Sequence, residues 1–152
     1  MLFYGCAIQT DSLGTGGNTI GVRFYGENSS TTCLNNIRFI KNTISGGYYN
    51  MYFYYAGGNN TPMQNKVASI IIDSNSLINA YYCGIYANYY NRFPSISYNT
   101  ILSRTNTASQ YYGIFSTWYN TIDTMQANKI NVTSLNTSNS SYGMYFQAFQ
   151  NY

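Results

Sequence analysis

Charged side chains and histidine are what this sequence has least of. Asp, Glu, Lys and Arg make up only 7% of its 152 residues, and there is no His. Soluble domains carry about 25% charged residues, so amide and hydroxyl groups must keep this chain in solution. Without His the chain lacks a frequent zinc ligand and the usual base of a nucleophilic triad. We therefore expect no catalytic residues, no metal site and no cofactor.

Basic clusters and long apolar runs are also missing. The seven Lys and Arg residues are scattered and give a net charge of +3. A nucleic-acid groove needs basic residues concentrated on one face, so we expect no nucleic-acid partner. No apolar run approaches the about 20 residues that cross a bilayer, so we expect no membrane span. By its length, the chain of residues 1–152 forms a single domain.

Cysteine occurs three times, at Cys6, Cys33 and Cys83, without the CxxC spacing of a metal site. An odd number of cysteines argues against a fold that disulfides hold together. Free buried thiols are one interpretation. A single bridge with one spare thiol is the other.

What the sequence does contain is a repeat rich in Tyr, Asn, Ser, Thr and Gly. Aromatic residues reach 18%, with 19 Tyr, so the chain differs from a disordered polar tract. One block recurs about every 30 residues, as in repeat architectures. Its five copies are Gly21-Val-Arg-Phe24, Asn50-Met-Tyr-Phe53, Gly84-Ile-Tyr-Ala87, Gly113-Ile-Phe-Ser116 and Gly143-Met-Tyr-Phe146.

A second block lies between these copies and centres on an asparagine. Its first copy is Ile37-x-Phe39-x-x-Asn42-x-Ile44, and three further copies keep the same spacing. Apolar residues that alternate before the asparagine predict a short strand, and the break in this alternation predicts a sharp bend. The asparagines of the four copies are Asn42, Asn75, Asn99 and Asn128.

Helices and hairpins fit this pattern poorly. No part of the chain shows the apolar stripe of a helix, and the Asn-Gly and Asp-Gly pairs that mark tight hairpins do not occur. Equivalent strands can instead stack in parallel and satisfy the backbone without hairpins. The sequence thus predicts an all-β fold, a parallel β-helix (solenoid) of about five coils.

The repeat resembles the right-handed parallel β-helix proteins of the pectin-lyase-like superfamily. The resemblance rests on the asparagine-centred block and on the strand that follows it, such as Gly84-Ile-Tyr86, and it covers roughly residues 18–150. It implies a right-handed solenoid and a fragment of a larger protein. Because that fold hosts lyases, hydrolases, adhesins and structural proteins, the resemblance leaves the function open.

Residues at equivalent positions are expected to form rows along the stack. Asn42, Asn75, Asn99 and Asn128 would form a polar row at the bend, where each amide can bond the next asparagine and the backbone freed by the turn. We expect this asparagine ladder to be buried and structural. The expected core rows are Ile37 and Ile70; Phe39, Ile72, Ile96 and Met125; Ile44, Leu77, Ile101 and Ile130; and Val22, Met51, Ile85, Ile114 and Met144.

An aromatic row is expected to point outward beside one of these core rows. Its members are Tyr52, Tyr86, Phe115 and Tyr145, with Arg23 in the first copy. A second aromatic group follows at Tyr55, Tyr89 and Trp118. Such rings stack on the apolar faces of sugars, so both groups are candidates for a polysaccharide platform. Alternatively, the rings stabilise the sheet or pack against a neighbouring domain.

The superfamily's enzymes set requirements that this sequence does not meet. The resemblance implies clustered acids that hold calcium, with an Arg or Lys base, in the lyases, and several Asp and a His in the hydrolases. The four carboxylates here fall in different rows. We predict a non-catalytic extracellular or cell-surface segment that acts as a stalk, an adhesin or a polysaccharide-contacting surface and self-associates end to end. The alternative is a carbohydrate-active module whose lyase or hydrolase site is incomplete.

Overall fold

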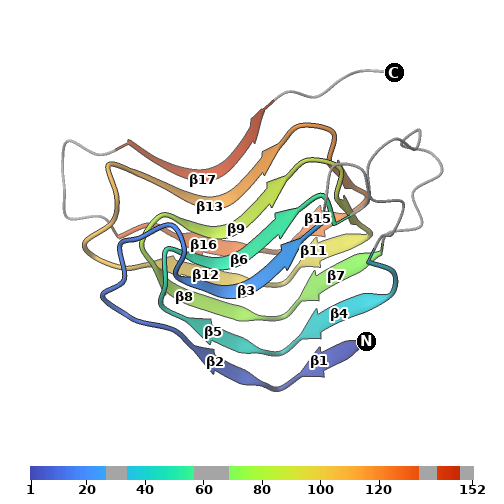
Figure 1. Ribbon diagram of the computed structural model, residues 1–152, viewed down its shortest axis with the longest axis horizontal. Helices are drawn as coiled ribbons and strands as arrows, with labels where there is room; N and C mark the ends of the chain where they lie inside the picture. Colours follow the sequence, from blue (N-terminus) through green and yellow to red (C-terminus); the bar gives the residue numbers. More distant parts are fainter. Residues whose placement is uncertain (27–33, 57–68, 134–139, 148–152) are drawn as a thin grey trace.

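The computed structural model describes residues 1–26, 34–56, 69–133 and 140–147. Within these residues every helix or strand element is a β-strand, and every strand pair is parallel. The strands form three sheets of five and one additional pair. Each sheet is a stack, with β1 and β2 at the bottom and β17 at the top of the view (Figure 1). The predicted all-β parallel solenoid is therefore confirmed.

Successive strands fall in the first, second and third sheet in turn. The first sheet contains β1 (Leu2–Tyr4), β4 (Ile37–Ile40), β7 (Ile70–Asp73), β11 (Ser95–Ser97) and β15 (Met125–Gln126). The second contains β2 (Ala7–Gln9), β5 (Thr43–Ser45), β8 (Ser76–Ala80), β12 (Thr100–Ser103) and β16 (Lys129–Asn131). The third contains β3 (Ile20–Tyr25), β6 (Tyr49–Tyr54), β9 (Cys83–Asn88), β13 (Gln110–Thr117) and β17 (Ser140–Gln147). The additional pair consists of β10 (Arg92–Phe93) and β14 (Thr121–Ile122).

The register places equivalent residues of successive coils beside one another. Phe39 pairs with Ile72, Ile72 with Ile96, and Ile96 with Met125, which are the members of one predicted row. The repeat begins earlier than the expected residue 18, because Phe3 pairs with Phe39. The first coil was missed because Cys6 stands where the later coils have the ladder asparagine.

The coils differ in how completely they are stacked. Each sheet has five strands, but the solenoid has about three turns rather than the predicted five coils. Only about three coils, those that contain β4 to β13, have a neighbour on both sides. Among the described strands, the first and last coils have a neighbour on one side only, and most of their inward residues are half-buried rather than buried.

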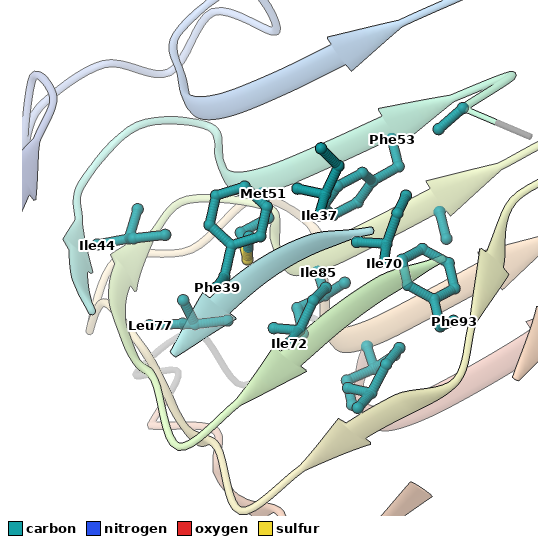
Figure 2. Close-up of a cluster of buried hydrophobic side chains, with 14 of the residues drawn as sticks. Ile37, Phe39, Ile44, Met51, Phe53, Ile70, Ile72, Leu77, Ile85 and Phe93 are labelled. Carbon is teal, nitrogen blue, oxygen red and sulfur yellow. The ribbon is translucent and has the colours of Figure 1, made fainter. Parts of the chain in front are cut away.

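The core fills the space that the three sheets enclose (Figure 2). Phe39, Ile72, Leu77 and Ile85 come from the predicted rows and are almost completely buried. Removing an aliphatic or aromatic side chain of this size from water contributes about 1.5–3 kcal/mol. Phe53 and Phe93, which lie outside those rows, complete the cluster. Their rings meet edge to face, with centroids 5.3 Å apart.

One member of the predicted core rows is exposed. Met144 is 51% exposed, although it pairs in register with the buried Ile114. Its strand, β17, is the last in the order of the third sheet. A residue in a solenoid row becomes buried only when coils cover it on both sides, so its position in the stack overrides its place in the repeat.

A sharp bend between the first and second sheets is built from a row of left-handed residues. The residue before each ladder position has a positive φ, between 51° and 65°. The row consists of Gly5, Lys41, Ser74, Tyr98 and Ala127. Only glycine adopts this conformation without cost, so the four side-chain-bearing members are tolerated because the ladder and the strands on either side fix the bend.

Candidate functional site

The outward face of the third sheet carries the predicted aromatic row. Tyr52, Tyr86, Phe115 and Tyr145 lie side by side in register, preceded by Arg23. The ring centroids of successive members are 5.2, 5.1 and 5.3 Å apart. The rings are not coplanar, because their planes are inclined to one another by 47°, 48° and 76°. The row therefore presents both ring faces and ring edges.

A second row of rings lies beside the first and covers part of it. The row consists of Tyr49, Tyr112 and Tyr142, with Cys83 in register between the first two. Tyr112 stacks on Phe115, with centroids 4.4 Å apart, and leaves Phe115 only 8% exposed. Phe115 was expected to face solvent, and it does point outward, but its neighbour covers it. We call the set Cys83, Tyr112, Phe115, Tyr49, Tyr82, Tyr86, Tyr142 and Tyr145 the outer aromatic cluster.

The second predicted aromatic group, which we call the corner stack, lies where the chain leaves the third sheet. Tyr55, Tyr89 and Trp118 stack in parallel, with centroids 5.1 and 6.0 Å apart and planes inclined by 3° and 8°. All three have positive φ values, from 48° to 55°. Trp118 is 42% exposed and presents the widest accessible ring of this group. Aromatic residues in this backbone conformation are uncommon, and such positions are frequent at functional sites.

The electrostatics of the third sheet are simple. Arg23 is the single charged side chain on the five strands that the structure describes there. Its guanidinium carbon lies 5.0 Å from the ring centroid of Tyr25 and 6.0 Å from that of Tyr52, a cation–π geometry. Burial, followed by the neighbouring Tyr52 phenol, raises the pKa of Tyr86 to about 12. The Tyr86 phenol is therefore neutral at physiological pH.

The predicted asparagine ladder is confirmed, and its members are hydrogen-bonded in series. The backbone N–H and the Nδ2 of Asn42 both donate to Oδ1 of Asn75, at 2.9 and 3.0 Å. Asn75 makes the same two bonds to Asn99, and Asn99 makes them to Asn128. Each Nδ2 also donates to a backbone carbonyl in the first-sheet strand of the preceding coil, as that of Asn75 does to Phe39 in β4. Because these buried amides are used within the fold, the ladder is structural.

A second, shorter ladder was not predicted. Asn91 donates its backbone N–H and Nδ2 to Oδ1 of Asn120, at 2.9 and 2.8 Å. The N–H of Ala56 donates in turn to Oδ1 of Asn91. The signal in the sequence was the asparagine seven residues after Gly84 and again after Gly113. This ladder holds the corner next to the corner stack.

Asp73 and Asp123 are both engaged by neighbouring groups of the fold. Oδ1 of Asp73 accepts hydrogen bonds from the Ser95 hydroxyl and the Ser97 backbone N–H. Asp123 forms an exposed ion pair with Arg92, at 2.9 Å. Within the described part of the chain, no group of three or more His, Cys, Asp or Glu side chains could hold a metal ion.

Two of the three cysteines lie within the described residues. Cys6 is exposed and Cys83 is buried, and neither forms a disulfide. Cys33 lies outside the described residues. Burial raises the pKa of the Cys83 thiol well above its ordinary value.

Among the described ranges, no helix has the length and apolar character to cross a bilayer.

The fold and its outward rows define the class of this protein as a tyrosine-faced parallel β-solenoid with internal asparagine ladders. Comparisons with protein-family models, curated proteins and solved structures found no match.

Proposed function

We propose that this chain is a non-catalytic segment of a secreted or cell-surface protein, in which the solenoid is a stalk or adhesin and its third sheet contacts polysaccharide. The same proposal places the chain among the right-handed parallel β-helices of the pectin-lyase-like superfamily. The observation that supports it is the continuous aromatic surface formed by the outer aromatic cluster and the corner stack.

The chemistry of this surface suits a polyhydroxylated polymer. Tyrosine and tryptophan rings offer apolar faces to the C–H groups of sugars, while the phenol and indole groups at their edges form hydrogen bonds. The rows run across successive coils, so an extended glycan along the solenoid axis would meet one ring per coil. Trp118 is exposed and most of the other rings are half-buried, and apolar surface that solvent can reach is typical of interaction sites.

The test is binding to a panel of neutral and acidic polysaccharides with matched variants. Trp118→Ala and Tyr86→Ala remove one ring from the corner stack and one from the outer aromatic cluster. Tyr98→Ala removes an exposed ring from a bend on another side of the coil and serves as the control. We expect a loss of affinity of about tenfold or more for the first two, which is about 1.4 kcal/mol, and no loss for the control.

Thermal unfolding of each variant separates binding from folding. A variant that keeps its melting temperature and loses the glycan supports a contact surface. If no polysaccharide binds the unmodified chain above background, or if binding survives both substitutions, the polysaccharide contact is wrong.

A further inference from the structure

Tyr25 and Tyr54 occupy paired positions in the first two coils of the third sheet. Their ring centroids are 4.7 Å apart and their planes are inclined by only 9°. The stacked rings of Tyr55 and Tyr89 in the corner stack are farther apart, at 5.1 Å. The two phenol rings therefore face one another at stacking distance.

The surroundings of this pair combine accessibility with restraint. Tyr25 is 59% exposed, so a reagent in solution can reach its phenol. The guanidinium of Arg23 lies 5.0 Å from the Tyr25 centroid and holds the ring by a cation–π interaction. Tyr54 is half-buried and is held from the other side by Tyr55, edge to face at 4.6 Å. The exposed phenol thus has a fixed partner in the next coil.

We propose that Tyr25 and Tyr54 are a site of oxidative cross-linking, at which a one-electron oxidant such as a peroxidase with hydrogen peroxide creates an intramolecular dityrosine. Each phenol gives one electron to the oxidant and one proton to water, which leaves two neutral phenoxyl radicals. Their unpaired electrons form a bond between the Cε atoms beside the two phenol oxygens. Each of these carbons then loses its hydrogen as a proton while a proton returns to each oxygen, so both aromatic phenols are restored.

The consequence of this bond is a covalent tie between the first and second coils. Among the described strands, β3 pairs with β6 alone, and a strand paired along one edge separates more easily than one paired along both. A bond between β3 and β6 would prevent the first coil from separating. This inference is independent of polysaccharide binding, because it rests on the geometry of one pair of rings.

The experiment treats the dilute full chain with peroxidase and hydrogen peroxide, then digests it with trypsin and maps the products by mass spectrometry. We expect a linked pair of peptides, residues 24–38 and 42–66, which have lost two hydrogen atoms and show dityrosine fluorescence. Tyr25→Phe keeps the stack but cannot form a phenoxyl radical. It should lower the intramolecular yield at least tenfold.

Tyr98→Phe is the matched control, because Tyr98 is equally exposed, at 57%, but its hydroxyl accepts a hydrogen bond from Gln126 instead of facing a tyrosine. Its yield should equal that of the unmodified chain. The position of the cross-link in the unmodified chain tests the proposal even if a variant folds poorly. A cross-link located at other tyrosines, products that are exclusively intermolecular, or an undiminished yield in Tyr25→Phe would each overturn the proposal.

Discussion

Arg104 donates from its Nη2 to the carbonyl oxygen of Gly14, 90 residues earlier in the chain, at 3.0 Å. The same nitrogen donates to the carbonyl oxygen of Gly47 at 3.1 Å. Its guanidinium lies 5.0 Å from the ring centroid of Tyr81. One side chain from the fourth coil therefore joins the three coils below it at the corner between the second and third sheets.

This arrangement predicts that Arg104→Ala destabilises the fold more than removal of an exposed arginine. Loss of hydrogen bonds from a charged, partly buried donor costs about 1.5–3 kcal/mol. Arg92→Ala, which breaks the exposed ion pair with Asp123, should cost about 0–1 kcal/mol. Urea unfolding of both variants checks the difference. Equal losses would mean that the contacts of Arg104 contribute no more than a surface pair.

Two equivalent glycines of the third sheet, Gly113 and Gly143, should respond differently to substitution by alanine. A Cβ at Gly113 would lie 2.5 Å from Cγ2 of Ile130 and still closer to the carbonyl oxygen of Gly143, whereas a Cβ at Gly143 would meet nothing within 4 Å. Gly113→Ala should therefore cost about 1–3 kcal/mol through overpacking. Gly143→Ala should be neutral or stabilise by up to about 1 kcal/mol, because alanine restricts the unfolded chain. Thermal unfolding that ranks the two variants in the opposite order would contradict the close approach at Gly113.

The asparagine ladder predicts a cost that depends on position along the stack. Asn75→Ala removes the acceptor of the buried backbone N–H of Asn42 and one donor to the carbonyl of Phe39, and a buried group left unsatisfied costs about 1–3 kcal/mol. Asn128→Ala disturbs an equivalent bond to Asn99, but Asn128 is half-buried, so water can replace part of the loss. Chemical denaturation should show a clearly larger loss for Asn75→Ala.

Identical spacing in four copies made the strands, the ladder and the core rows predictable from the sequence. The first coil was missed because Cys6 replaces the asparagine that marks the other copies. Its backbone N–H nevertheless donates to Oδ1 of Asn42, at 2.9 Å, as an asparagine's would. The cysteine at position 6 hides the first coil in the sequence pattern, but the backbone hydrogen bond to the ladder is kept.

The orientation of the aromatic rings could not be predicted, because periodicity gives only the face on which a residue lies. Strict alternation would place Tyr112 and Phe115 on opposite faces, yet their rings stack. Gly113 lies between Tyr112 and Ile114, both of which pair with residues of β9, but Gly113 itself has no partner in the register of β9 and β13. The same gap recurs at the equivalent glycine or asparagine of each strand pair in the third sheet, so the cover over Phe115 follows from a repeated break in alternation that a simple period of two does not reveal.

The left-handed bend row predicts a stabilising substitution. Ala127 has a φ of 51° and is exposed, a conformation that costs an L-residue roughly 1–2 kcal/mol. Ala127→Gly removes this cost, offset in part by the greater freedom of glycine in the unfolded chain, so we expect a gain of about 0.5–1 kcal/mol. Gly5→Ala is the reciprocal control. Gly5 has a φ of 65°, and a Cβ added there would meet nothing within 4 Å. Gly5→Ala should therefore lower the stability of the protein by a similar amount.

The outer aromatic cluster predicts a loss of stability at alkaline pH. Burial raises the pKa of Tyr86 to about 12 and also raises those of Tyr49, Tyr82 and Tyr112. An unfolded tyrosine ionises near pH 10. Since the folded pKa lies above the unfolded one, this stabilisation is fully present below about pH 10 and is lost as the pH rises toward about 12. Unfolding free energies measured between pH 8 and 12 should stay level up to about pH 10 and then fall. The contribution of Tyr86 to this fall is at most on the order of 3 kcal/mol. Tyr86→Phe removes one of these ionisations and should make the fall shallower, whereas an identical fall in both proteins would show that Tyr86 titrates alike in the folded and unfolded chains.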